Sequence, residues 1–342
     1  MVDRGKPGWE DLPDEQLMQL RIRDLGLKIR HSPLEPFIGQ LYGELDARGI
    51  RYHPPCYLAD EWFCPNKVPV IAVPFCLAHP RLKHIEMRMM YEVEGGTPKT
   101  CMKLLRHECG HALNYAYLFY RRTRWREVFG PFSAPYSTSY RFQPYSRRFV
   151  LHLQDNYAQA HPDEDFAETF AVWLDPESRW ETKYQDWPVI RKLRYVDRLM
   201  RAAGEQAPRV SAHQKTPSSA DRMTSTLAAY YERKRKYLGS DFPGYYDEML
   251  RRIFPATAAA DGAPRASSFL RRHRRRIINS VTAWSGHRKY DIHGLVAKLV
   301  KRCDALGLRI AAPEPETLIE LTALITTVAN NALRMPPDRA KK

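Results

Sequence analysis

Two histidines and a glutamate occur within five residues of one another in the segment HECGH, at positions 107–111. In a helix, His107 and His111 lie on the same face and can bind one metal ion. Glu108 lies about 100 degrees further round the helix, near a metal-bound water, where its carboxylate can act as a general base. Zn²⁺ lowers the pKa of such a water to about 7, which provides a hydroxide nucleophile for an amide carbonyl. The alternative is a fortuitous pair of histidines on a partly exposed helix face.

A catalytic zinc site normally has three protein ligands, and HECGH supplies two of them. Position 114 is Asn and position 117 is Tyr, so the HExxHxxGxxH arrangement is absent and the third ligand must lie on another element. The downstream candidates are His152, His161, Asp163, Glu164 and Glu168.

The segment DEDFAETFAVWL, residues 163–174, contains the most informative of these candidates. Glu164 and Glu168 are one helical turn apart and are surrounded by apolar residues. If Glu164 binds the metal, Glu168 can accept a hydrogen bond from a ligand imidazole and fix its tautomer. An ordinary acidic first turn, favoured by the helix dipole, explains Asp163 and Asp165 but explains Glu168 less well, because it lies a turn further in.

The pairing of HECGH with YAQAHPDEDFAETFAVWL about fifty residues later resembles the gluzincin class of zinc metallopeptidases. It is more closely similar to a bacterial family of zinc-binding metallopeptidases that pairs HExxH with an EDxAETF-type helix. The segments DEWFCPN and PFCLAHPRL also resemble that family, so that the resemblance extends over about residues 60–174. It implies a zincin-like core, Zn²⁺ as the cofactor and Glu164 as the third ligand, with Glu168 beside a ligand imidazole. Many members have Asp at this last position, which leaves Glu168 open as the ligand; Glu164 is favoured.

Tyr157 is a second residue to which the resemblance gives a role. A tyrosine seven residues before the glutamate ligand of lethal-factor-like sites is similar to this one, which implies that the Tyr157 phenol stabilises the oxyanion of the tetrahedral intermediate. A packed aromatic side chain is the alternative, because the chain contains 19 tyrosines. A structural role at a helix start is favoured for His161, which precedes Pro162.

The elements around these motifs predict an α+β fold. Thr97-Pro98 opens a helix with the expected cap and first-turn proline, and its periodicity continues through HECGH to about Tyr120. A second helix begins after His161-Pro162. Short β-favouring runs between residues 51 and 80, interrupted by prolines, predict a small mixed sheet packed on the HECGH helix, and the rest is predicted to be predominantly helical. The VPVIAVPF run could offer an edge for a substrate strand, although a buried core strand is the plainer interpretation.

Composition shifts divide the chain into three predicted regions. They are an N-terminal helical segment at 1–50, a zincin-like metallopeptidase core at 51–205 and a helical, basic C-terminal region at 206–342. The boundary at 205 is predicted from the polar, aperiodic segment GEQAPRVSAHQKTPSSA.

The net charge of +15 favours anionic partners, and one basic run, RRHRRR, stands out in the C-terminal region. Nucleic acid, an anionic membrane surface or an acidic protein could bind its arginines, which are Arg271, Arg272, Arg274, Arg275 and Arg276. A solvated basic helix face is the alternative. The sequence begins with polar residues and contains no apolar run of the roughly 20 residues that span a membrane. Its six cysteines include no CxxC pair. These features predict a cytoplasmic protein with reduced thiols.

Two functions follow from these patterns. The first is a zinc-dependent metallopeptidase that hydrolyses a peptide or protein substrate with a metal-activated water and Glu108 as base. The alternative is a basic helical binding protein that contains a structural zinc site or an inactive peptidase.

Overall fold

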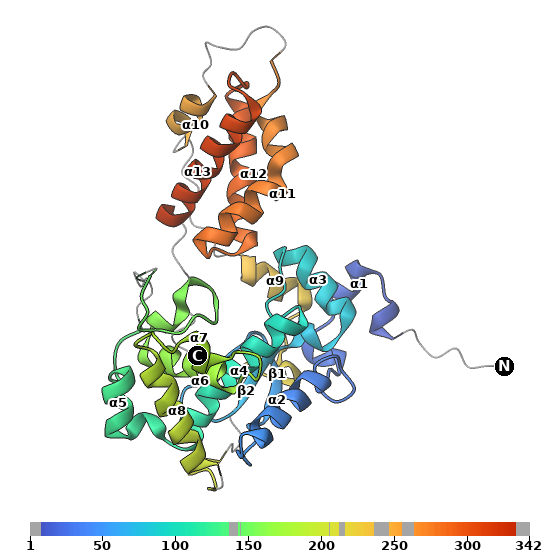
Figure 1. The fold of residues 1–342 in the computed structure, drawn as a ribbon. Coiled ribbons are helices and arrows are strands. Elements are labelled where there is room, and N and C mark those ends of the chain that lie inside the picture. Colours follow the sequence, from blue (N-terminus) through green and yellow to red (C-terminus); the bar gives the residue numbers. More distant parts are fainter. Residues whose placement is uncertain are drawn as a thin grey trace, which may run out of the picture. The chain divides into compact units, whose positions relative to one another are not determined.

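The computed structural model describes residues 8–136, 143, 145–204, 206–211, 216–235, 246–254 and 263–332. These residues form two compact units, one of residues 8–89 and 93–231, the other of residues 90–92 and 232–332 (Figure 1). The three-region organisation expected from the sequence stays a prediction.

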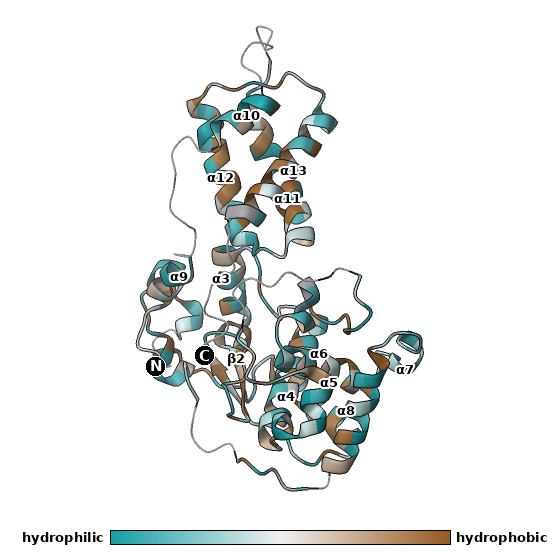
Figure 2. Ribbon diagram, turned by 90° about the vertical axis from the view of Figure 1, so that its left-hand side faces the viewer, coloured by the Kyte–Doolittle hydropathy of each residue, from teal (hydrophilic) through white to brown (hydrophobic). Residues whose placement is uncertain are grey.

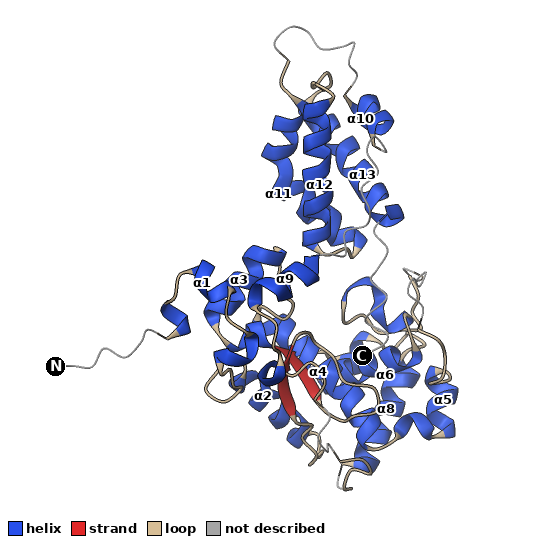
Figure 3. Cartoon of the chain, turned by 180° about the vertical axis from the view of Figure 1, so that it is seen from behind, coloured by secondary structure: helices blue, strands red, loops and turns tan. Residues whose placement is uncertain are grey.

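The first unit is mostly helical and contains a small sheet (Figure 3). Its helices are α1 (Asp14–Met18), α2 (Glu35–Ala47), α3 (Pro80–Met90), α4 (Pro98–Ala116), α5 (Thr123–Phe129), α6 (Pro162–Leu174), α7 (Trp180–Lys183), α8 (Ile190–Ala203) and α9 (Leu227–Arg235). The last residue of α3 and the last four residues of α9 are assigned to the second unit. The mostly helical α+β architecture predicted from the sequence is therefore confirmed.

The sheet consists of strands β1 (Cys56–Ala59) and β2 (Ile71–Pro74), which pair in parallel with Cys56 opposite Ile71. A mixed sheet was expected; within the described residues, antiparallel pairing is limited to isolated bridges such as Phe63 to Ala72. Pro65 and Pro69 lie in the connection between the strands and lack the amide that a ladder requires, which disfavours a third strand there.

Strand β2 is fully buried, as the plainer of the two interpretations of VPVIAVPF requires. The Ala72 amide donates to the Phe63 carbonyl over 2.9 Å, and the Phe63 amide donates back to Ala72 over 3.5 Å. The main-chain groups of Ala72 are therefore already paired, and β2 does not present them to a substrate strand.

Helix α4 contains HECGH and begins with a capping box. The Thr97 hydroxyl accepts from the Thr100 amide, the Thr100 hydroxyl accepts from the Thr97 amide, and Pro98 occupies the first turn. Arg106, on the same helix, is buried and donates to Glu44 of α2 through two bonds of 2.7 Å. It also lies 3.2 Å from Asp175, directly after α6, so that one guanidinium connects three segments around the HECGH helix.

Helices α4 and α6 approach each other closely at Gly110. A Cβ atom at this position would lie 2.9 Å from the Cα of Ala167 and 3.1 Å from its carbonyl oxygen. Backbone cannot move aside as a flexible side chain can, so the glycine of HECGH is required for the distance between the two helices. We predict that Gly110→Ala lowers the free energy of unfolding by about 1–3 kcal/mol, because α6 must shift away from α4.

Urea denaturation measures this effect, and Gly43→Ala in α2 is the matched control. A Cβ at Gly43 meets nothing within 4 Å, so the same substitution there is expected to be neutral or stabilising by up to about 1 kcal/mol. Equal stabilities of the two variants would show that the approach at Gly110 does not determine the packing.

The second unit is a helical bundle of α10 (Asp247–Ile253), α11 (Ala266–Ser285), α12 (Lys289–Ala305) and α13 (Glu314–Ala332). Figure 2 shows apolar residues along α11, α12 and α13, and buried members such as Phe269, Leu299 and Ile325 belong to one hydrophobic core. None of the helices in the described part of the chain combines the length and the apolar character that a bilayer crossing needs.

The basic run from Arg271 to Arg276 lies on α11, and several of its members have partners in the same bundle. Arg271 donates to Asp304 over 2.5 Å, and Arg274 donates to the His293 ring over 3.0 Å. Arg272 lies 3.7 Å from Glu314. Arg275 and Arg276 are exposed. Some arginines of the run therefore have partners in the bundle, and all of them except Arg274 are exposed.

Candidate metal centre

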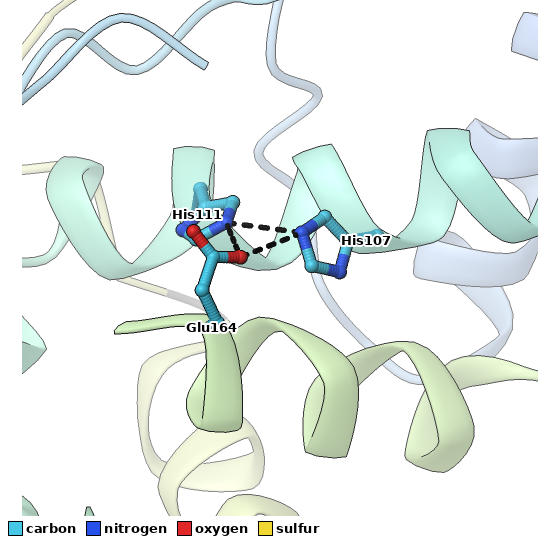
Figure 4. A group of neighbouring side chains, drawn as sticks. All are labelled: His107, His111 and Glu164. Atoms are coloured by element: carbon cyan, nitrogen blue, oxygen red, sulfur yellow. Dashed lines mark hydrogen bonds and ion pairs between the residues drawn. The ribbon is translucent and has the colours of Figure 1, made fainter. Parts of the chain in front are cut away.

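Three side chains from α4 and α6 meet in the interior of the first unit (Figure 4). His107 and His111 lie one turn apart on α4, and Glu164 lies in the first turn of α6. The His107 Nε2 atom is 3.2 Å from His111 Nε2, and each is 3.1 Å from Glu164 Oε2. All three residues are buried, His107 with only 3 % of its surface exposed. The structure thus brings together the three predicted ligands.

A second carboxylate stands behind each imidazole. The Glu168 Oε1 atom is 2.7 Å from His107 Nδ1, and its Oε2 atom accepts from the Leu153 amide over 2.9 Å. On the other ring, His111 Nδ1 forms an ion-pair contact of 3.1 Å with Asp163 Oδ2. Each carboxylate favours a proton on the Nδ1 atom that it faces, which leaves both Nε2 lone pairs directed toward Glu164.

The donor set fits a divalent cation, with zinc as the best match. Two imidazole nitrogens and one carboxylate oxygen are the ligands of a catalytic zinc site that keeps a fourth position open. Ligand atoms about 2.0–2.1 Å from a tetrahedral ion lie roughly 3.3 Å apart, close to the separations of 3.1–3.2 Å found here. A positive charge at the point where these atoms converge, either a metal ion or protons on the imidazoles, offsets the charge of the buried carboxylates.

The carboxylates around the two histidines also raise the pKa values of both imidazoles. Burial lowers the pKa of His107, but Glu164 and Glu168 outweigh it and raise the value to about 10. Burial likewise opposes protonation of His111, and Asp163 and Glu164 raise its pKa well above the usual range. Three buried carboxylates around two imidazoles therefore create a strongly negative potential, which favours a cation.

Asp163 was named from the sequence only as a possible third ligand, whereas the structure places its carboxylate beside the His111 ring. The helix dipole was a sufficient explanation of its position, but its side chain also accepts from Asn114 Nδ2 over 2.7 Å and from the Tyr115 hydroxyl over 2.5 Å. These contacts hold the carboxylate against His111. The sequence contained only a weak indication of this contact: Asp163 directly precedes Glu164, and Asn114 and Tyr115 follow His111 by three and four residues.

The contacts of Asp163 and Glu168 with the two imidazoles lead to a testable prediction. Asp163→Asn and Glu168→Gln are each expected to weaken zinc binding by about 10- to 100-fold, because each removes the negative partner of one ligand imidazole. Competition with a chromophoric chelator measures the affinity. Asp165→Asn, next to Asp163 but paired with Lys192 over 2.5 Å, is the matched control; because Asp165 forms no hydrogen bond or ion pair with either imidazole, the substitution is expected to leave the affinity within about threefold. Equal losses in all three variants would argue against specific support of the imidazoles.

Glu108, the predicted base, lies between the two histidines on α4 and is 7 % exposed. Burial raises the pKa of its carboxyl, while His107 and His111 lower it, and the net shift is upward. No hydrogen bond from the described residues occupies its carboxylate. Its oxygens are free to bond a water or a substrate group, as a general base requires.

Two tyrosines lie close to the three-residue group. The predicted Tyr157, in the 3₁₀ helix Gln154–Gln159, has its ring 5.8 Å from that of His107. Tyr136 was not predicted: its hydroxyl donates to Glu164 Oε1 over 3.1 Å, and its ring stacks on His161 at 3.8 Å. No pattern in the sequence separated it from the other tyrosines.

The remaining ligand candidates have other partners. His161 caps α6, with its Nδ1 accepting from the Asp163 amide over 3.1 Å and its Nε2 lying 2.8 Å from the Ala134 carbonyl. The His152 Nε2 atom is 3.0 Å from the Lys103 carbonyl oxygen. Neither belongs to the three-residue group.

A buried His-His-Glu group on two packed helices is typical of zinc hydrolases. Residues 88–213, which contain α4 and α6, match the family model described as "Putative zinc-binding metallo-peptidase". This match confirms the resemblance to zinc-binding metallopeptidases that the motifs indicated, and it includes every residue of the centre. No curated protein and no solved structure matches the chain.

Proposed function

We propose that the chain is a zinc-dependent metallopeptidase of the gluzincin type with a zincin-like core. The observation that supports this most strongly is the convergence of His107, His111 and Glu164 on one point, with the carboxylate of Glu108 close enough to interact electrostatically with both histidines. The family match supports a hydrolase of this kind. Zn²⁺ is the proposed cofactor, and a peptide or protein the proposed substrate. The six free cysteines support the further proposal of a cytoplasmic location.

In this proposal, each group of the chain has a defined task. His107, His111 and Glu164 hold the metal ion, while Asp163 and Glu168 orient the two imidazoles. Zinc bound there supplies Lewis-acid activation of a water and of the scissile carbonyl. Glu108 removes a proton from the attacking water and then delivers it to the leaving amine. The phenol of Tyr157 donates a hydrogen bond to the oxyanion.

Cleavage of an unfolded protein substrate by the purified, zinc-loaded chain tests the proposal. Mass spectrometry of the products is expected to show new peptide termini that disappear after treatment with a zinc chelator and return when zinc is added. Absence of cleavage from a chemically diverse set of peptides, at full zinc occupancy and over a broad pH range, would contradict it.

The alternative, a basic binding protein, stays a prediction. It expects retention on immobilised DNA that falls with salt and is lost when Arg275 and Arg276 are replaced by glutamine. Retention that is unaffected by these replacements would remove the basis of this alternative.

A further inference from the structure

A cleft in the first unit has an unusually high positive charge. It is lined by residues of α5, of α8 and of the segment before the 3₁₀ helix Gln154–Gln159. It has a volume of about 550 Å³. Six of its lining residues are cations, and one is a carboxylate, Glu127. The cations are Arg124, Arg148, Arg191, Lys192, Arg194 and Arg198. None of the lining residues belongs to the metal centre.

The carboxylates at the cleft neutralise only two of these cations. Glu127 pairs with Arg124 over 2.7 Å, and Asp165, at the adjoining pocket, pairs with Lys192 over 2.5 Å. The other four arginines make no ion pair with a carboxylate anywhere in the described residues. Several unneutralised guanidinium groups around one cavity repel one another and attract an anion.

Helix α8 places three of the four on one face. Arg191, Arg194 and Arg198 follow one another at intervals of three and four residues, the spacing of neighbours on a helix surface. Like charges at this spacing repel one another and destabilise the helix. Asp197, which could relieve the repulsion, instead accepts from Trp173 and Arg201.

A buried polar atom among the lining residues is a second, independent observation. Tyr195 lines the cleft and is only 7 % exposed, yet its hydroxyl has no hydrogen-bond partner. Burial raises the pKa of this phenol, while nearby arginines lower it, and the net upward shift keeps the group protonated as a donor. An unsatisfied buried hydroxyl is costly unless a ligand oxygen accepts from it.

We propose that this cleft binds a compact anion that carries two or three phosphate groups. Guanidinium groups match the geometry of phosphate oxygens, and a chain of phosphates concentrates several negative charges within a small volume. Glu127 and Asp165 each pair with one cation, whereas a ligand with several negative charges can pair with several of the four remaining, exposed arginines at once. Because the Tyr195 hydroxyl is closed off from solvent, an overlying side chain must move aside before this hydroxyl donates to one of the phosphate oxygens. This inference does not depend on the proposed peptidase function.

Isothermal titration of the full chain with inorganic triphosphate, at about 0.15 M salt to screen weak surface attraction, tests the inference. We expect saturable 1:1 binding that Arg191→Gln/Arg194→Gln/Arg198→Gln weakens by about a hundredfold, and Tyr195→Phe by about fivefold. The matched control is Arg252→Gln/Arg275→Gln/Arg276→Gln, which removes the same charge from exposed positions of the second unit and is expected to bind normally. Circular dichroism and zinc content verify that each variant is folded.

The outcome identifies the source of the phosphates or overturns the proposal. Equal affinity for triphosphate and ATP assigns recognition to the phosphates alone, and tighter binding of ATP assigns a nucleotide. Absence of binding at millimolar triphosphate, equal losses in the cleft and control variants, or tighter binding of a glutamate-rich peptide would each overturn it.

Discussion

Glu108→Gln is expected to reduce peptide cleavage by about 10²- to 10⁴-fold while the chain keeps one zinc ion and its stability. Glutamine has nearly the same shape as glutamate but cannot accept the proton of the attacking water at neutral pH. Because Glu108 is not among the three converging ligand atoms, the substitution leaves the metal centre intact. Cleavage rate, zinc content and melting temperature are measured on the same preparation.

Glu61→Gln provides the control for this experiment. Glu61 is exposed in the connection between β1 and β2, so the same chemical change there is expected to leave the rate unaltered. If the Glu108 variant cleaved as fast as the parent, the assignment of the base would be wrong. If it lost zinc together with activity, Glu108 would be a residue of the metal centre rather than the base.

Removal of a ligand is expected to have the largest effect on metal binding. His111→Ala deletes one of three ligand atoms, and the purified variant is predicted to contain no stoichiometric zinc. Zinc at a thousandfold excess over its dissociation constant stabilises the parent by about 4 kcal/mol, because it binds the folded state alone. The variant is predicted to lose this zinc-dependent rise in melting temperature.

The control for ligand removal is His31→Ala, since the His31 side chain is mostly exposed and remote in sequence from the motif. It is expected to retain both zinc and the zinc-dependent stabilisation. A fully zinc-loaded His111→Ala variant would show that the metal is held elsewhere in the chain.

The four residues of the centre that follow a helical spacing, His107, His111, Glu164 and Glu168, could be predicted from the sequence. The threonine and proline at the start of α4 and the four-residue spacing of His107 and His111 place two ligands on one helix face without knowledge of the rest of the fold. The same spacing of Glu164 and Glu168 indicated that one carboxylate faces the metal and the other an imidazole. The structure positions them in this way, with Glu168 on His107 and Glu164 between the two histidines.

The features that depend on how helices cross could not be obtained in this way. Asp163 contacts His111 where α6 packs closely against α4 at Gly110. The sequence around Gly110 does not reveal which helix packs against this glycine. Tyr136 belongs to a loop without periodicity. The parallel pairing of β1 and β2 likewise depends on the path of the connection, which prolines restrict but do not specify.

X-ray absorption at the zinc edge of the purified full-length chain tests the central claim most directly. The arrangement of His107, His111 and Glu164 predicts one zinc per chain, surrounded by nitrogen and oxygen atoms at about 2.0–2.1 Å, with imidazole scattering from two histidines. His111→Ala is expected to abolish this signal. Sulfur ligands at about 2.3 Å, or an unchanged spectrum in His111→Ala, would contradict the metal centre described above.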